Sequence, residues 1–326
     1  MRAVVLEEYG GPEVLAVREI PDPECGPEDL LVDVVATAMN RADLLQRMGL
    51  YPGPPTEHEV PGLEFAGTVA AVGSLVAGVE VGDAVMGIVG GGAHAERLAV
   101  HHRQVLPVPT TVTVADAGAI PEVFLTAWDA LVVQGGLTAG RRALVHAGAS
   151  GVGTAAIQIA KAYGADIFVT ASSGKVDRCR QLGADLAIDY TATDFVDAVR
   201  DATGGTGVDV ILDVIGGDYV DRNLACLAVQ GRIIQVGVMG EAQAQINVSR
   251  LLPLRASLIG TVLRSRPLEE KIALTQRFKR EMSGRFDNGE LAPVIDRRFA
   301  LDDIASAHEL MATNTNVGKI VIDVGS

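Results

Sequence analysis

From Gly140 to about residue 238, short apolar runs alternate with segments of helical character. The expected strands are ALVHAG, DIFVTA, LAIDY, VDVILDVIG and RIIQVGV, at residues 143–148, 166–171, 186–190, 208–216 and 232–238. The segments between them, 151–165, 175–184, 194–203 and 219–229, are expected helices. Strands that are continuous apolar runs are typical of sheets buried on both faces, so this alternation predicts a doubly wound parallel α/β sheet.

The two ends of the chain have a different texture. The first third contains short β-branched runs separated by turn residues, with one short helix expected near residues 41–48. Residues after about 260 mix helices and strands, and the helix expected at 268–284 is amphipathic. We therefore expect residues 119–260 to form the doubly wound domain, and residues 1–118 and 261–326 to fold together into a β-rich second domain.

Composition excludes several classes of protein. A length of 326 residues suggests two domains, and a net charge of -14 makes nucleic acid an unfavourable partner. The chain has no apolar run long enough to span a membrane and no signal-peptide pattern at its start. Three isolated cysteines, Cys25, Cys179 and Cys226, form no metal or disulfide pattern. These features predict a cytoplasmic protein that binds neither membrane nor nucleic acid.

A glycine-rich turn joins the first expected strand to its helix. Gly148-Ala149-Ser150-Gly151-Val152-Gly153 matches the spacing of the dinucleotide fingerprint G-x-G-x-x-G, with Ser150 in place of the second glycine. The turn opens a helix whose N-terminus favours a pyrophosphate, and serine is small and carries a hydroxyl donor. The alternative is a tight turn of small residues that binds nothing; the βα units that follow favour phosphate binding.

The end of the second expected strand bears on the choice of cofactor. NAD-binding folds place an acid there, about 20 residues after the turn, on the ribose 2′-hydroxyl. This chain has Ser172 and Ser173 at that point, followed by Lys175 and Arg178. Hydroxyls and cations suit a 2′-phosphate, which predicts NADPH rather than NADH. The alternative is that Lys175 and Arg178 are solvated helix residues.

This order of a β-rich start, a late nucleotide domain and a C-terminal return resembles the medium-chain dehydrogenase/reductase superfamily, which implies a Rossmann domain and a GroES-like catalytic domain. Zinc-dependent members carry cysteine and histidine ligands where this chain has Asn40 and Leu63. The cysteines of their structural zinc lobe are also missing, and the histidines here are scattered. The resemblance therefore implies a zinc-independent enzyme with no metal site.

Within that superfamily the chain resembles the quinone oxidoreductases from end to end. The shared segments are MNRADLLQRMGLYPGPP, PGLEFAGTV, AIPEVFLTAW, HAGASGVGTAAIQIAK, ILDVIGG, LLPLRASLIGTVLRSR and NVGKIVIDV. The Gly-Tyr-Pro loop and the serine–arginine run resemble the branch that a tumour suppressor induces in animals. The resemblance implies an NADPH-dependent quinone reductase that is a homodimer through its nucleotide domains. The segment RLLPLRASLIGTVL fits a dimer edge, with an ordinary buried strand as the alternative.

The matching positions imply a set of site residues. The implied cofactor contacts are Asn40 and Thr126 at the nicotinamide; Gly148, Ser150, Gly151, Val152 and Gly153 at the pyrophosphate; Ser172, Ser173, Lys175 and Tyr190 at the 2′-phosphate; and Gly237, Met239, Ser265, Arg266, Asn316, Gly318 and Lys319 elsewhere on the cofactor. Tyr51 is expected to line the quinone pocket. We expect Asn40 and Tyr51 to serve catalysis, with the alternative that Tyr51 only caps its loop.

Two other functions remain open at this stage. One is an NADPH-dependent reductase of activated carbon–carbon double bonds, such as enones or enoyl thioesters, which needs the same cofactor and no metal. The other is a protein that binds NADPH without turnover. Cofactor oxidation with a panel of acceptors distinguishes all three.

Overall fold

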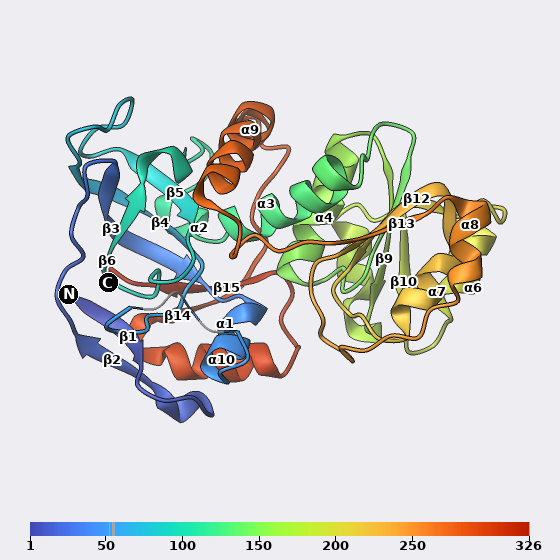
Figure 1. Ribbon diagram of the computed structural model, residues 1–326, viewed down its shortest axis with the longest axis horizontal. Coiled ribbons are helices and arrows are strands. Elements are labelled where there is room, and N and C mark those ends of the chain that lie inside the picture. Colours follow the sequence, from blue (N-terminus) through green and yellow to red (C-terminus); the bar gives the residue numbers. More distant parts are fainter. Residues whose placement is uncertain (52, 54–55, 326) are drawn as a thin grey trace. The chain divides into compact units, whose positions relative to one another are not determined.

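The computed structural model describes residues 1–51, 53 and 56–325, and the chain forms two compact units. The discontinuous unit contains residues 1–122 and 264–326, and the continuous unit contains residues 123–263 (Figure 1). The domain ends expected from the sequence, residues 118 and 260, precede these boundaries by four and three residues. No helix in the described part of the chain is both long enough and apolar enough to cross a membrane.

The continuous unit contains a six-stranded sheet in the order β10-β9-β8-β11-β12-β13, and every neighbouring pair is parallel. Its strands are β8 (Arg142–Val145), β9 (Asp166–Ala171), β10 (Leu186–Asp189), β11 (Val208–Asp213), β12 (Leu227–Gln235) and β13 (Ser257–Gly260). Counted from β8, this is the strand order 3-2-1-4-5-6 of the Rossmann fold. The doubly wound sheet expected from the alternation is therefore confirmed.

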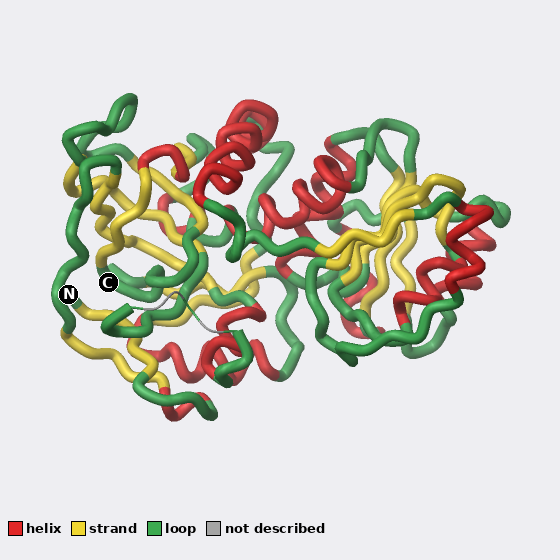
Figure 2. The backbone as a smooth tube through the Cα atoms, viewed as in Figure 1, coloured by secondary structure: helices red, strands yellow, loops and turns green. Residues whose placement is uncertain are grey.

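Helices cover both faces of this sheet, and the central strands β8, β9 and β11 are accordingly buried along most of their length (Figures 1 and 2). The helices of this unit are α4 (Gly151–Ala162), α5 (Val176–Gln181), α6 (Phe195–Ala202), α7 (Tyr219–Ala225) and α8 (Leu251–Leu254). Side chains of α6, α7 and α8 share one largely buried cluster with residues from five of the strands. Their apolar residues, spaced for a helix, are thereby buried against the sheet.

Two expectations about this unit are wrong. The helix expected at 219–229 ends at Ala225, and Leu227 already pairs with Val208 in the neighbouring strand. Strand pairing there overrides the helical spacing of the apolar residues. The alternative that residues 250–263 form a buried strand also fails: α8 is followed by β13, an edge strand on which Leu258 is 45% exposed.

The discontinuous unit is built on a mainly antiparallel sheet in the order β14-β15-β3-β4-β5-β7, with β6 paired to β3 and a separate β1–β2 hairpin. Its strands are β1 (Arg2–Leu6), β2 (Leu15–Glu19), β3 (Asp29–Ala38), β4 (Glu64–Val72), β5 (Ala84–Ile88), β6 (Arg97–His101), β7 (Val105–Pro107), β14 (Ile295–Ala300) and β15 (Lys319–Asp323). Because β15 pairs with β3, the two ends of the chain fold into one sheet, as the sequence predicts.

The helices of the discontinuous unit are short except for α9. They are α1 (Arg41–Arg47), α2 (Val114–Ala117), α9 (Leu268–Asp287) and α10 (Ile304–Ala312), while α3 (Pro121–Trp128) begins at the boundary between the two units. The short helix expected near residues 41–48 is thus α1. Its N-cap is Asn40, two residues after the end of β3, and this position matters for the site.

Candidate functional site

The turn between β8 and α4 is organised by Ser150. Ser150 is the N-cap of α4, and its Oγ accepts a hydrogen bond from the N–H of Gly153 at 3.1 Å. Its carbonyl accepts from the N–H of Thr154 at 2.8 Å, so Gly151 and Val152 carry the remaining N–H groups of the first turn, which have no acceptor within the helix. Because the hydroxyl acts as an acceptor toward Gly153, it keeps its own proton for an anion. This helix start suits a pyrophosphate.

Two glycines of this turn are required by packing. A Cβ at Gly148 would lie 2.5 Å from Cβ of Val169, and a Cβ at Gly153 would lie 2.4 Å from the carbonyl oxygen of Ala147. The backbone of Ala147 has a positive φ of 57°, which tightens the turn further. Strand, turn and helix therefore approach one another as closely as the dinucleotide fingerprint demands.

A buried polar network ties together the strand ends around the turn. His146 Nε2 lies 2.8 Å from Asn223 Oδ1, and His146 Nδ1 lies 3.1 Å from Thr170 Oγ1 in β9. Asn223 donates to the carboxylate of Asp213, which ends β11 and also accepts two backbone N–H groups of the next turn. Burial lowers the pKa of His146 and favours the neutral ring. The network fixes β8, β9 and β11 where the strand order reverses.

Sequence reasoning missed this network, although a signal was present. His146, Thr170 and Asp213 are polar residues at or near the carboxyl ends of three otherwise apolar strands. In a parallel sheet those ends lie at one edge, where ligands of such folds bind.

The residues expected at the 2′-phosphate lie at the carboxyl ends of two paired strands. Ser172, Ser173 and Lys175 follow β9 in a short 3₁₀ turn, and Tyr190 follows β10 with its side chain 49% exposed. The hydroxyls of Ser173 and Thr191 lie 3.0 Å apart. The structure therefore brings the two segments together, through the pairing of β9 with β10.

An acid that the sequence interpretation did not consider belongs to the same group. Asp189 is the last residue of β10 and pairs in register with Ala171, the last residue of β9. Its Oδ1 accepts from the N–H of Thr191 at 2.9 Å and from the Thr191 hydroxyl at 2.6 Å. Hydrogen bonds from Ser173 and Thr191 lower the pKa of the Asp189 carboxyl. β9 itself ends without an acid, as expected, but the neighbouring strand supplies one.

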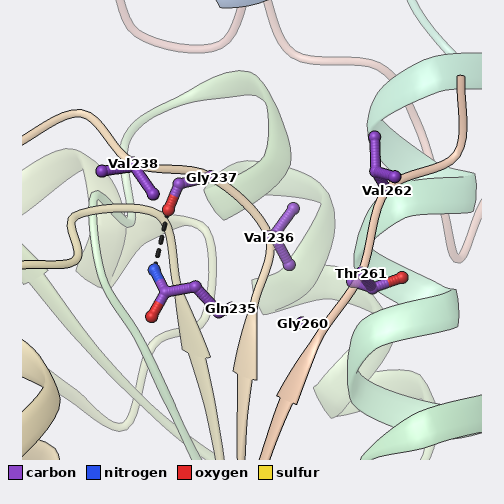
Figure 3. A pocket seen from close by; sticks show the side chains of 7 residues that line it. All are labelled: Gln235, Val236, Gly237, Val238, Gly260, Thr261 and Val262. Carbon is purple, nitrogen blue, oxygen red and sulfur yellow. Dashed lines mark hydrogen bonds between the residues drawn. The ribbon is translucent and has the colours of Figure 1, made fainter. Parts of the chain in front are cut away.

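A mostly apolar hollow lies at the carboxyl ends of β12 and β13, with a volume of about 320 Å³ (Figure 3). Its lining residues are Gln235, Val236, Gly237, Val238, Gly260, Thr261 and Val262. The side-chain amide of Gln235 donates to the carbonyl of Gly237 at 2.7 Å and fixes that wall. Gly237 therefore lines a pocket, whereas Met239 is 45% exposed and is not among the lining residues. A pocket of this kind suits a flat ring.

Thr261, in the pocket wall, is held from the adjoining helix. Gln134 Nε2 donates to Thr261 Oγ1 at 2.8 Å and to Asp129 Oδ2 at 2.6 Å. Residues Asp129–Gln134 form a π-helix, a rare helix type found frequently at functional sites. In the preceding α3, the hydroxyl of Thr126 is buried with no hydrogen-bond partner in the part of the chain that the structure describes. Such a group is typical of a site that a ligand completes.

In the discontinuous unit, Asn40 is held rigidly. Asn40 is the N-cap of α1, and its backbone N–H donates to the carboxylate of Asp43 at 2.7 Å. Its side-chain Nδ2 donates to Glu64 Oε1 at 2.9 Å. The ammonium of Lys319 donates to Asn40 Oδ1 at 2.7 Å and to the carbonyl of Met39 at 2.6 Å, and lies 2.7 Å from Glu64 Oε1. These oxygens occupy all three N–H donors of Lys319, whose expected contact with a cofactor stays a prediction.

Asp43 and His94 lie fully buried beside this group. Burial raises the pKa of Asp43 to about 6, and burial lowers the pKa of His94 to about 3. Asp43 also accepts from the N–H of Gly62 at 3.2 Å, and His94 Nδ1 lies 3.2 Å from the hydroxyl of Thr37. The 3.9 Å separation of His94 Nε2 and Asp43 Oδ2 is close enough for an ion pair, but the depressed pKa makes the imidazole neutral. The pair anchors the start of α1 without forming a salt bridge.

The ring of Tyr51 packs against the guanidinium group of Arg264. The Arg264 guanidinium carbon lies 4.7 Å from the Tyr51 ring centre, and Arg264 Nη1 donates to the Tyr51 carbonyl at 3.0 Å. Arg264 also donates to the carbonyl of Gly90 and to Gln46 Oε1. Burial raises the pKa of the Tyr51 hydroxyl, which favours the protonated form. Residues 52, 54 and 55 of the Gly-Tyr-Pro loop lie outside the described residues. Sequence reasoning missed Arg264.

The remaining expected cofactor contacts lie in loops of the discontinuous unit. Ser265 is exposed and Arg266 partly buried in the turn before α9. Asn316 Nδ2 donates to the carbonyl of Gly318 at 2.8 Å. Gly318 has a φ of 81°, and a Cβ there would lie 2.2 Å from the carbonyl oxygen of Val294, so only glycine fits. Their roles at the cofactor remain predictions.

Comparison with known proteins matches both units. Residues 26–110 match the alcohol dehydrogenase GroES-like domain, and residues 151–279 match the zinc-binding dehydrogenase family. Human quinone oxidoreductase is 31% identical over 327 residues, which cover 99% of this chain and 97% of the human protein. The chain belongs to the quinone oxidoreductase family of the medium-chain dehydrogenases/reductases. Its continuous unit accordingly corresponds to a nucleotide-binding Rossmann domain, and its discontinuous unit to a GroES-like domain.

Other members of this superfamily are similar along the whole chain. The chain is 26% identical to Escherichia coli quinone oxidoreductase solved with NADPH, with a TM-score of 0.89 and coverage of 99% and 100%. It is 27% identical to CurK enoyl reductase, with a TM-score of 0.88 and coverage of 99% and 98%. A phenolphthiocerol/phthiocerol polyketide synthase subunit of Mycobacterium tuberculosis is 33% identical over 321 residues, but this chain spans only 14% of its length.

The name of one matching family raises the question of a metal. The zinc-binding dehydrogenase match begins at residue 151, after both positions at which the sequence lacks the expected ligands. At those positions the amide of Asn40 is bonded to Lys319 and Glu64, and Leu63 is a buried apolar side chain. Within residues 1–51, 53 and 56–325, no three His, Cys, Asp or Glu side chains are grouped to hold a metal ion.

Proposed function

We propose that this protein is an NADPH-dependent quinone oxidoreductase that works without a metal. The observation that carries the proposal is the arrangement in the continuous unit, where the Ser150 turn and the group of Ser172, Ser173 and Lys175 follow adjacent parallel strands. A dinucleotide with a 2′-phosphate needs an anion site at each of these two places. Similarity to human and E. coli quinone oxidoreductases supports a quinone as the acceptor.

The residues of this chain fit the cofactor. Gly151 and Val152 offer N–H groups for the pyrophosphate, Ser150 offers a hydroxyl proton, and the pocket at Gly237 offers an apolar wall for a ring. The unpartnered hydroxyl of Thr126 offers a further polar contact. When bound, NADPH supplies the hydride, and the protein supplies orientation and exclusion of water.

The discontinuous unit supplies fixed polar groups. Asn40 is held by Glu64 and Lys319, so its amide has a single orientation. The buried ion pair of Lys319 and Glu64 holds the amide of Asn40, at the position where the sequence lacks the cysteine ligand of zinc-dependent members, which supports metal-independent action. Reduction of a quinone places negative charge on a ring oxygen, and the protonated hydroxyl of Tyr51 is the donor that we propose for it.

A second candidate is a reductase of activated carbon–carbon double bonds. Similarity to CurK enoyl reductase favours it, at nearly the same identity as E. coli quinone oxidoreductase. A quinone oxygen takes its proton readily from solvent, whereas a carbon centre needs a positioned acid. Dependence on the Tyr51 hydroxyl is therefore expected to be stronger for an enone than for a quinone.

We also propose that the protein forms a homodimer through β13. This strand ends the sheet of the continuous unit, and its outer edge pairs with no other strand in the described residues. The strand itself carries an exposed apolar side chain, Leu258, which is 45% exposed. An exposed apolar edge strand favours pairing with a second copy.

The first experiment is steady-state oxidation of NADPH and NADH with ortho- and para-quinones, one enone and one enoyl thioester, followed by nicotinamide absorbance. We expect NADPH to be oxidised by quinones with a higher kcat/KM than NADH. Faster turnover of the enone or thioester would support the second candidate. Binding of NADPH without oxidation by any acceptor would show a non-catalytic binding protein.

A charge-reversal pair tests the 2′-phosphate group. Lys175→Glu should raise KM for NADPH at least tenfold and leave KM for NADH nearly unchanged, because a negative charge then faces the phosphate. Lys279→Glu is the control, since it changes the net charge equally at an exposed position of the other unit. Equal effects of the two variants would contradict the assignment of Lys175.

A further inference from the structure

The geometry points to Asp189 as the residue that limits the preference of this protein for a 2′-phosphorylated cofactor. The inference rests on the proposed function and assigns a role at the same site. Asp189 ends β10 in register with the end of β9, directly beside the segment that carries Ser173 and Lys175. Its negative charge therefore lies within the group that is proposed to receive the phosphate.

The hydroxyls of this group are committed to the carboxylate. Thr191 Oγ1 donates to Asp189 Oδ1 at 2.6 Å, and Ser173 Oγ lies 3.0 Å from Thr191 Oγ1. Hydrogen bonds from both hydroxyls lower the pKa of Asp189, so the carboxyl group is ionised at neutral pH. A hydroxyl that donates to a carboxylate cannot donate the same proton to a phosphate.

Two charged side chains therefore have opposite effects on the binding of a 2′-phosphate at this site. The Lys175 cation favours a 2′-phosphate, whereas the Asp189 carboxylate repels it and holds the proton of Thr191, whose hydroxyl is in turn the partner of Ser173. A ribose 2′-hydroxyl is a donor as well as an acceptor, so the carboxylate does not penalise it. The structure thus predicts that the protein binds NADPH only somewhat more tightly than NADH. Asp189 is the residue that keeps this difference in affinity small.

The test is binding rather than turnover, with adenosine 2′,5′-bisphosphate and 5′-AMP as probes that differ only in the 2′-phosphate. Asp189→Asn keeps an oxygen that can accept the Thr191 N–H but removes the charge. By calorimetry at physiological salt, where the screening length is about 8 Å, we expect the bisphosphate to bind about five- to tenfold more tightly to this variant, as removing a unit charge about 6 Å away predicts. Binding of 5′-AMP should change less than twofold.

Asp166→Asn is the matched control. Asp166 begins β9, so it lies about 17 Å along the strand from the phosphate group, beyond the screening length at physiological salt. It removes the same charge from the same unit and should leave the affinities for both probes unchanged. Asp189→Ser is a second variant, used if Asp189→Asn does not reach the melting temperature of the wild type.

The outcomes separate the inference from the proposed function. If the bisphosphate binds wild type and both Asp189 variants equally, the inference is wrong and the proposed function stands. If Asp166→Asn tightens binding as much as Asp189→Asn, the effect is one of net charge and the inference is again wrong. If neither probe binds the wild type, the proposed function itself fails.

Discussion

The ammonium of Lys319 lies 2.7 Å from the carboxylate of Glu64, and both side chains are buried, with 3% and 0% of their surfaces exposed. Lys319 begins β15, Glu64 begins β4, and β3 lies between these strands in the sheet. The pair reaches across the end of β3, where Asn40 bonds to both partners. One ion pair therefore joins the C-terminal strand to the N-terminal part of the sheet and orients the proposed catalytic amide.

Removing one partner of this pair should be costly. Lys319→Met leaves the Glu64 carboxylate buried without its cation, and we expect a loss of about 3–5 kcal/mol in the free energy of unfolding. The measurement is chemical denaturation followed by circular dichroism. Arg277→Met, which removes an exposed i,i+4 partner of Glu281, is the control and should cost at most about 1 kcal/mol. Equal losses in the two variants would show that the buried pair contributes nothing specific.

Ser150 combines two roles that substitution separates. Ser150→Ala loses the N-cap bond to Gly153 and should cost about 1 kcal/mol of stability, whereas Ser150→Gly should cost only a few tenths. Both variants lack the hydroxyl proposed to contact the pyrophosphate, so both should bind NADPH more weakly than the wild type. Thermal unfolding measures the first effect and calorimetry the second. Wild-type affinity in Ser150→Gly would exclude a contact from the hydroxyl.

Acid should destabilise the protein through its buried histidines. Burial lowers the pKa values of His94 and His308 to about 3, from an ordinary value of 6.5. Below pH 6.5 the unfolded chain binds protons that the folded protein does not, so stability is lost progressively as pH falls from 6.5 toward 3. Asp43 acts in the opposite direction, because its pKa is raised to about 6 and protonation relieves the cost of its burial. Burial also lowers the pKa of His146, so three histidines oppose one carboxyl group and a net loss is expected.

A substitution tests this pH dependence. Both ring nitrogens of His308 are buried without a hydrogen-bond partner among the described residues, so His308→Leu removes a titrating group without breaking such a bond. Urea unfolding at pH 7.5 and pH 5, as chosen conditions, should show a smaller loss in the variant, by about 1 kcal/mol for each unit of pH below 6.5. Parallel curves for wild type and variant would show that His308 is not a source of the acid sensitivity.

Tyr51→Phe tests the proposed proton donor. The raised pKa keeps the Tyr51 hydroxyl protonated through neutral pH, and its loss should lower kcat for an enone by about a hundredfold or more. For a quinone we expect less than about tenfold, because solvent can supply the proton. Tyr9→Phe, which removes an exposed hydroxyl bonded to Glu59, is the control and should leave kcat unchanged. An unchanged kcat for both acceptors in Tyr51→Phe would remove the hydroxyl from the mechanism.

The proposed dimer has its own test. Light scattering after size exclusion should give about twice the chain mass of 34.0 kDa for the wild type. Leu258→Lys, on the exposed face of β13, should shift the protein toward the monomer, because a buried charge at an interface is unfavourable. Val81→Lys introduces the same charge at an exposed position of the other unit. A monomeric wild type would refute the proposal.

Much of the continuous unit is predictable from the sequence, because its strands carry a local signal. Residues 166–171 are mostly apolar and are followed by serines and a helix, so strand, turn and helix each follow from neighbouring residues. The same local reasoning failed at residues 227–229. Their helical spacing continues that of α7, and only the pairing of Leu227 with Val208 makes them part of β12.

The candidate site also contains some residues that the sequence predicts and others that it does not. Ser150 and Lys175 are recognised by their position after a strand, and the structure places them there. Asp189 is two residues from Thr191 but sixteen from Ser173, and nothing local indicates that its carboxylate reaches both hydroxyls. Arg264 is equally hidden, since its contact with Tyr51 joins residues more than two hundred positions apart.

The sequence by itself determined the alternation of strands and helices, the glycine-rich turn at Ser150 and the residue types at positions 40 and 63, which are not zinc ligands. Each of these depends on periodicity or residue type within a short window. Only the tertiary structure decided that Lys319 holds Asn40 through Glu64 and that Asp189 joins the group around Ser173. Both arrangements depend on strand order and register, which fix long-range neighbours that no local pattern specifies.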